Sequence, residues 1–129
     1  MSWSSPYFTH GEMACKCGKC DAVEMMDPGF MEKLTALRGD WGQPMIINSA
    51  YRCSLHPVEQ RKEKPGAHAQ GRAADIAISG EDAYKFLCVA LGHGFTGIGV
   101  AQKGNHSSRF IHIDDLYETE AYRPTIWSY

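Results

Sequence analysis

The sequence lacks long apolar runs, blocks of like charge and any excess of basic residues. Its apolar stretches are only a handful of residues long, whereas a transmembrane helix needs roughly 20 apolar residues. Thirteen basic residues stand against fifteen acidic ones, for a net charge of −2. A protein that holds nucleic acid through its phosphates would instead carry a basic surface. We therefore expect no membrane insertion and no nucleic-acid partner.

The first residues, MSWSSPYFTHGEM, also lack the charged start and the apolar stretch of a signal peptide. We therefore expect synthesis in the cytoplasm, where disulfide frameworks are rare, and the odd number of five cysteines agrees with this. The sequence does contain 43% hydrophobic and 22% charged residues, which suits one domain with its own core. We expect a single monomeric domain over 1–129, with an irregular cysteine-containing segment at 1–26 and a tail at 115–129.

Apolar spacing and turn residues predict two helices and four strands. The first helix begins at Asp27-Pro28 and ends at Gly39 or Gly42, and the second begins with a capping box at Ser79 and ends at Gly92 or Gly94. The predicted strands are Pro44–Ala50, Arg72–Ser79, Gly97–Ala101 and Arg109–Asp114, with a loop at Tyr51–Ala67 and a turn at Gly104-Asn105. The sum is an α+β domain in which helices pack on one small, mainly antiparallel sheet.

Two histidines and one aspartate have the spacing of a metal site. His68 and Asp75 are seven residues apart, and they can converge if the chain turns at Gly71 between them. His112 lies in the last predicted strand, where alternation places it on the same face as Asp114. A lone histidine is more often a surface or hydrogen-bonded residue than a ligand. Together, two histidines and a carboxylate form a catalytic zinc set that leaves a fourth position for water.

Three motifs carry a resemblance to a known family. They are SAYR at 49–52, H-x-x-G-x-A-x-D at 68–75 and F-x-H-x-D at 110–114. In combination they resemble the zinc D-Ala-D-Ala carboxypeptidase family, which belongs with the hedgehog-type and lysostaphin-type metallopeptidases and includes many phage endolysins. The resemblance runs from about Phe8 to Asp114. It implies a hedgehog/DD-peptidase-like zinc fold in which His68, Asp75 and His112 are the zinc ligands.

The same resemblance implies that Arg52 holds a carboxylate or carbonyl of the substrate, which a guanidinium fork matches well. The alternative is a solvated surface arginine. Two positions depart from the family pattern: Gly66 replaces a serine found in several members, and Arg109 stands where many relatives have the acid that serves as general base. Other relatives have histidine where this chain has Phe110.

Asp114 is our first candidate to orient or deprotonate the attacking water, because alternation places it on the His112 face. It could equally hydrogen-bond a zinc ligand. His106 and Glu118 are poorer candidates for the general base, since no spacing places them near the ligands.

The cysteines leave three alternatives open. Cys15, Cys17 and Cys20 form C-x-C-x-x-C, and Cys53 follows Arg52 as a candidate fourth thiolate. A structural zinc at these four residues is the least favoured alternative, because standard zinc spacing has two separated C-x-x-C pairs. An oxidisable or disulfide pair and free thiols are the others. Cys88 is expected in the buried face of the second helix.

The combined expectation is a zinc metallopeptidase that hydrolyses an amide bond in peptidoglycan stem peptides, either D-alanine-containing or of the L-Ala–D-Glu type. A small single-domain protein of this kind resembles a phage lysis enzyme that reaches the wall after holin-type release, or a virion component for wall penetration. The main alternative is a zinc-binding module of the same fold that no longer cleaves, which the missing acid at position 109 keeps open. A nucleic-acid-binding zinc knuckle at Cys15–Cys20 conflicts with the absence of a basic face.

Overall fold

One five-stranded mixed sheet forms the centre of the molecule. A computed structural model describes residues 2–20, 24–62 and 66–129. The strand order is β1 (Ile46–Ser49), β2 (Ala73–Ala77), β4 (Phe110–Asp114), β3 (Gly97–Ala101) and β5 (Thr125–Ser128). All neighbours are antiparallel except β3 and β5, which run parallel. The expected α+β class with a mainly antiparallel sheet is confirmed.

The helices of the described chain are α1 (His10–Met13), α2 (Pro28–Trp41) and α3 (Gly80–Leu91), with single 3₁₀ turns at Glu59–Arg61 and His106–Ser108. The start of α2 follows its sequence signals, because the Asp27 carboxylate accepts a hydrogen bond of 2.9 Å from the Phe30 N–H. The helix ends at Gly42, whose φ of 72° is the left-handed conformation that glycine tolerates.

The prediction of a capping box at Ser79 was wrong. Ser79 precedes α3 but its hydroxyl makes no capping hydrogen bond, and it lies instead 3.4 Å from His106 Nδ1. A complete capping box occurs at Thr9 and Glu12, where each side chain accepts the other residue's backbone N–H. The expectation that 1–26 is irregular was therefore wrong at α1, while residues 21–23 lie outside the described chain, as do residues 63–65 of the expected loop.

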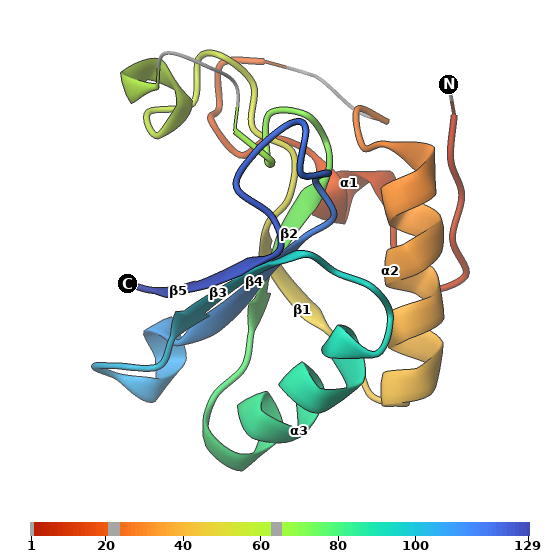
Figure 1. Cartoon of the computed structure of the whole chain (residues 1–129). Coiled ribbons are helices and arrows are strands. Elements are labelled where there is room, and N and C mark those ends of the chain that lie inside the picture. The colour runs from red at the N-terminus through yellow and green to blue at the C-terminus, as the bar shows by residue number, and fades with distance from the viewer. Residues whose placement is uncertain (1, 21–23, 63–65) are drawn as a thin grey trace.

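The hydrophobic core lies between the sheet and the two long helices, which cover the same face of the sheet (Figure 1). Alternate strand residues point into it, and helix residues fill it from the other side. Its buried members include Phe30, Leu34, Leu37, Ile76, Phe86, Ile98, Ile111 and Ile113. The intervening strand residues point to the opposite face, which carries the polar site described below.

Two further expectations need correction. Cys88 was expected in the core, but its side chain is exposed on α3. None of the four strands predicted from the sequence lies in the tail at 115–129, yet this tail supplies β5 and so completes the sheet. No helix among the described residues is long and apolar enough to cross a membrane.

Candidate active site

A row of paired residues runs straight across the open face of the sheet. Ser49 pairs with Asp75, Asp75 with His112, His112 with Gly99, and Gly99 with Trp127. Because paired residues of neighbouring strands point to the same side, strand pairing brings two residues distant in sequence, Asp75 and His112, to the centre of the sheet.

His68 reaches the same place from the loop before β2. Its Nδ1 lies 2.7 Å from the Ala50 carbonyl oxygen, which can only accept, so Nδ1 carries the proton and donates. The Nε2 atom is then left with its lone pair, and it lies 3.3 Å from Asp75 Oδ1. The turn between His68 and Asp75 depends on Gly71, whose φ is 70° and where a Cβ would collide with the backbone at Met25.

The His112 ring is held between two aspartates. Its Nδ1 lies 3.0 Å from Asp75 Oδ1, and its Nε2 lies 2.7 Å from Asp114 Oδ2. The free nitrogen of His68 and the Nδ1 of His112 therefore converge on a single oxygen of Asp75. All three residues are at most 6% exposed, and one donor atom from each lies within 4.8 Å of the others.

The electrostatics of this cluster favour a bound cation. Burial raises the pKa of Asp75, but the contacts of its carboxylate with the His112 and His68 rings outweigh it and hold the pKa well below its usual value. Burial lowers the pKa of His68, which favours the neutral ring that a metal requires. Burial likewise opposes charge on His112, yet Asp114 and Asp75 raise its pKa. A positive charge between these carboxylates is thus stabilised.

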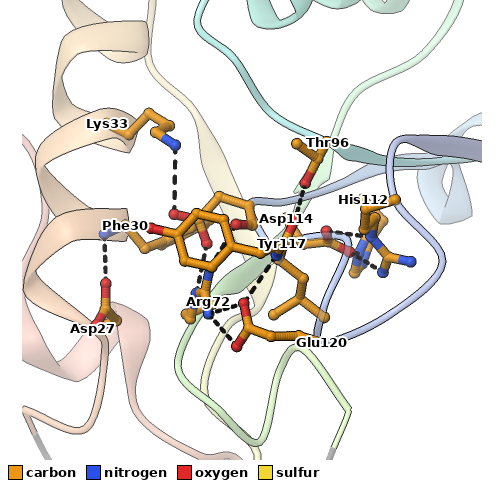
Figure 2. Close-up of polar contacts among 12 residues, drawn as sticks. Asp27, Phe30, Lys33, Arg72, Thr96, His112, Asp114, Tyr117 and Glu120 are labelled. Carbon is orange, nitrogen blue, oxygen red and sulfur yellow. Dashed lines mark hydrogen bonds and ion pairs between the residues drawn. The ribbon is translucent and has the colours of Figure 1, made fainter.

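Asp114 is fully buried, and both of its oxygens are occupied. The guanidinium of Arg123 donates to Oδ1 at 2.8 Å and to Oδ2 at 2.7 Å, and His112 meets Oδ2. Burial raises the pKa of Asp114, but His112 and Arg123 lower it to about 2. The carboxylate fits only because residue 97 is glycine, since a Cβ there would collide with it. Asp114 and His112 lie beside one another in Figure 2.

Arg52 lies at the edge of the cluster, where its Nη2 is 3.2 Å from Asp75 Oδ2. Its Nε donates to the Ser49 hydroxyl at 3.0 Å, and its backbone N–H donates to the His68 carbonyl. The arginine is therefore held against the cluster by three contacts, and its side chain is mostly buried.

A cavity of about 550 Å³ opens over the cluster. Its wall includes Arg52, Phe110, Arg123, Trp127 and Tyr129 together with the three clustered residues. The other described residues of its lining are Val58, Lys62, Gly66, Ala67, Gln70, Asp114, Leu116, Glu120 and Ala121. The cavity therefore has a charged floor and an aromatic side.

The other residues considered from the sequence lie elsewhere. His106 and Glu118 are exposed and do not line the cavity. The Arg109 guanidinium donates to the Gly104 carbonyl. Glu120 does line the cavity, but its carboxylate is held by Arg72 at 2.6 and 2.7 Å, beside the Tyr117 ring (Figure 2).

Sequence reasoning missed the contribution of the tail. Trp127 stacks near the His112 ring, with centroids 5.0 Å apart, and Arg123 lies over Trp127. Tyr129 meets Phe110 in the same way at 5.0 Å. The sequence does contain a signal for this strand: Trp127 and Tyr129 alternate with other residues, which is typical of a strand with one aromatic face.

The described chain holds a second group of metal-binding side chains. Cys15, Cys17, Cys20 and Cys53 place their sulfur atoms within 4.8 Å of one another. The backbone N–H of Lys19 donates to the Cys17 sulfur and, with neighbouring thiols, lowers the pKa of Cys17 to about 6. We refer to these four residues as the cysteine cluster.

Comparison with known families gives one match. The family model described as Peptidase M15 matches residues 6–114 of the chain. That span contains the cysteine cluster and the group formed by His68, Asp75 and His112, which we call the histidine–aspartate cluster. It ends before Arg123 and Trp127. A comparison with curated proteins gives no match.

Proposed function

Because the chain belongs to the Peptidase M15 family, we propose that it is a zinc-dependent peptidase that hydrolyses an amide bond in bacterial peptidoglycan stem peptides. The observation that carries the proposal is the convergence of His68 Nε2, His112 Nδ1 and Asp75 Oδ1 on the floor of an open cavity. Zinc peptidases require that arrangement, since three protein ligands leave one position for water or substrate.

The donor set fits zinc. Two imidazole nitrogens and one carboxylate oxygen are ligands that zinc accepts, and each histidine is oriented through its other ring nitrogen. For His68 that second contact is the Ala50 carbonyl, and for His112 it is Asp114. When bound, zinc would polarise the scissile carbonyl and lower the pKa of an attacking water.

Arg52 is suited to hold the substrate. Two of the five N–H donors of its guanidinium are engaged by described residues, at Ser49 and Asp75. The remaining donors can bind a carboxylate or carbonyl of a stem peptide with charge-assisted hydrogen bonds. Fixing the peptide against the cluster would place its amide bond over the ligands.

We assign Asp114 the task of orienting His112, in preference to taking the proton of the attacking water. Its two oxygens already accept three hydrogen bonds, from Arg123 and His112, and its pKa of about 2 makes it a weak base. A carboxylate so placed fixes the ring and raises its basicity as a ligand.

The same observation supports a second candidate, a zinc-binding module that does not cleave. The described residues that line the cavity provide Asp75, Asp114 and Glu120 as carboxylates. The first would be a ligand, and the other two are held by arginines. A module of this kind would bind wall peptides without turnover.

For the substrate we propose a stem peptide with D-alanine or with the L-Ala–D-Glu bond, and for the setting a phage lysis or wall-penetration enzyme. The cavity supports a short peptide, because it combines an arginine for a carboxylate with the aromatic side chains of Phe110, Trp127 and Tyr129.

The test is digestion of purified peptidoglycan of several stem-peptide types, with and without a chelator. New amino or carboxyl termini, identified by mass spectrometry, are expected only without chelator. His106→Ala serves as a matched control that should cleave like the wild type, because this exposed histidine lies off the cavity. Binding of zinc with no new ends on any wall type would favour the non-cleaving module.

A further inference from the structure

The cysteine cluster has no part in the proposed hydrolysis, yet it has the dimensions of a metal site. Cys17 Sγ lies 3.4 Å from Cys53 Sγ and 3.5 Å from Cys20 Sγ, and Cys15 Sγ lies 3.5 Å from Cys53 Sγ. Four sulfurs around one zinc ion lie about 3.8 Å apart, because the Zn–S bond is about 2.3 Å in a tetrahedron. The observed separations are close to this value.

The arrangement is less suited to disulfide bonds, in which the two sulfurs are about 2.0 Å apart. Cys17 and Cys53 each approach two other sulfurs at nearly equal distances, whereas a disulfide joins each sulfur to one partner. A shared central ion explains why the four sulfurs gather around one point.

Backbone groups also support thiolates at this place. The N–H of Lys19 donates to Cys17 Sγ at 3.2 Å, and the N–H of Cys53 donates to Cys15 Sγ at 3.3 Å. The first of these bonds lies in the turn Cys17–Cys20, which Gly18 makes with a φ of 74°. Such bonds stabilise negative sulfur, which is the form that binds a metal.

The segment that carries three of these cysteines, residues 14–20, is not anchored in the hydrophobic core. Among the described residues, none from 14 to 20 belongs to the buried hydrophobic clusters. The segment hydrogen-bonds to the sheet through Lys16, whose Nζ donates to the Ile47 and Asn48 carbonyls. Cys53, the fourth member, is buried and directly follows Arg52.

We propose that the cysteine cluster binds one zinc ion as a closed four-thiolate site, which fastens residues 14–20 to the loop that carries Arg52. A closed site has no open position, so the role of this ion is structural. Binding by residues of two distant segments, Cys15–Cys20 and Cys53, stabilises the folded chain because the unfolded chain has no preformed site.

Metal content of the whole protein, grown with zinc, tests the proposal. The wild type should hold two zinc ions per chain, one for each cluster. His68→Ala should hold one, and adding Cys17→Ser and Cys20→Ser should remove it. The matched control is Cys88→Ser, an exposed cysteine on α3 outside the cluster, which should leave the metal content unchanged.

A cobalt-substituted sample makes the test independent of whether the cysteine variants fold. Cobalt bound by thiolates gives an intense charge-transfer band in the near ultraviolet, which imidazole and carboxylate ligands do not give. The proposal predicts this band in the wild type and in His68→Ala. Folded His68→Ala with no bound metal, a cobalt form without the band, or purified protein with the four cysteines oxidised would each overturn it. Peptidase activity does not enter this readout.

Discussion

The molecule brings metal-binding side chains together in two places that are built differently. The histidine–aspartate cluster lies over the sheet, where strand pairing sets Asp75 beside His112. Hydrogen bonds fix the imidazole rings of His68 and His112. The cysteine cluster lies on loops, and three of its four members are partly exposed. One has three donors and opens to a cavity, and the other has four donors facing one another.

This difference suits the first cluster to catalysis and the second to a structural role. Two ligands on the sheet, Asp75 and His112, and one on the adjoining loop, His68, would leave a coordination position free for substrate, and the oriented rings would keep that position constant. Four thiolates on loops would leave no such position, so an ion bound by them would only connect chain segments. Removing ligands from the histidine–aspartate cluster should therefore abolish activity, whereas removing ligands from the cysteine cluster should lower stability.

The largest expected effect comes from His68→Ala, which removes a ligand from the open cluster. We expect cleavage to fall to the chelator-treated level while the cysteine-bound zinc and the fold remain. Cys17→Ser with Cys20→Ser should do the opposite and lower the unfolding temperature while the histidine cluster keeps its zinc. Paired measurements of activity, metal content and thermal unfolding check both. Equal losses of all three in both variants would remove the distinction.

Asp114→Asn should come next in size. Removing the charge that orients a ligand histidine typically costs 10–100-fold in metal affinity or activity, so we expect a zinc affinity lower by about that factor. Competition with a coloured chelator measures it. The matched control is Asp115→Asn, a neighbouring buried aspartate that pairs with Arg72 and Lys33 and should affect stability alone. Lost activity with unchanged zinc affinity would instead assign Asp114 to proton transfer.

Arg52→Lys should affect substrate binding more than turnover. A lysine keeps the charge but loses the two-pronged geometry, and a charge-assisted hydrogen bond is worth about 1.5–3 kcal/mol. We expect KM to rise roughly 10-fold or more with little change in kcat. Arg109→Lys makes the same chemical change at an arginine bonded to the Gly104 carbonyl and should leave KM unchanged. A fall in kcat alone would argue against a binding role.

Gly99→Ala should have the smallest effect. A Cβ at this position would come within 3.0 Å of Trp127 Nε1 and the Tyr129 hydroxyl, so β5 must shift. We expect the free energy of unfolding to fall by about 1–3 kcal/mol and activity to fall several-fold. Gly39→Ala provides the contrast, because its Cβ would make only an ordinary contact at 3.6 Å with Tyr7. Equal stability of both variants would show that the tail does not pack as described.

Much of the sheet and the site follows from local sequence signals. The strands at Gly97–Ala101 and Phe110–Asp114, and the helix after Asp27, carry clear periodicity and caps. The meeting of His68, Asp75 and His112 could be expected because their motifs resemble a known family and because Gly71 permits the turn. The caps and the turn at Gly71 depend on residues close together in the chain, whereas His112 was placed by the resemblance of its own motif.

The parts that could not be predicted depend on distant contacts. Arg123 reaches the site because β5 pairs with β3 in parallel, and nothing near Arg123 in the sequence indicates that pairing. Likewise the spacing of Cys15, Cys17 and Cys20 matches no standard zinc motif, because the fourth sulfur comes from Cys53 in the loop after β1. In both cases tertiary packing supplies what local pattern lacks.

A crystal of the zinc-loaded protein, measured on both sides of the zinc absorption edge, tests the two-cluster account most directly. The account predicts two anomalous peaks: one bounded by His68 Nε2, Asp75 and His112 Nδ1 and open to the cavity, the other enclosed by the cysteine cluster. A structure with no peak at the histidine–aspartate cluster would contradict the account at its centre.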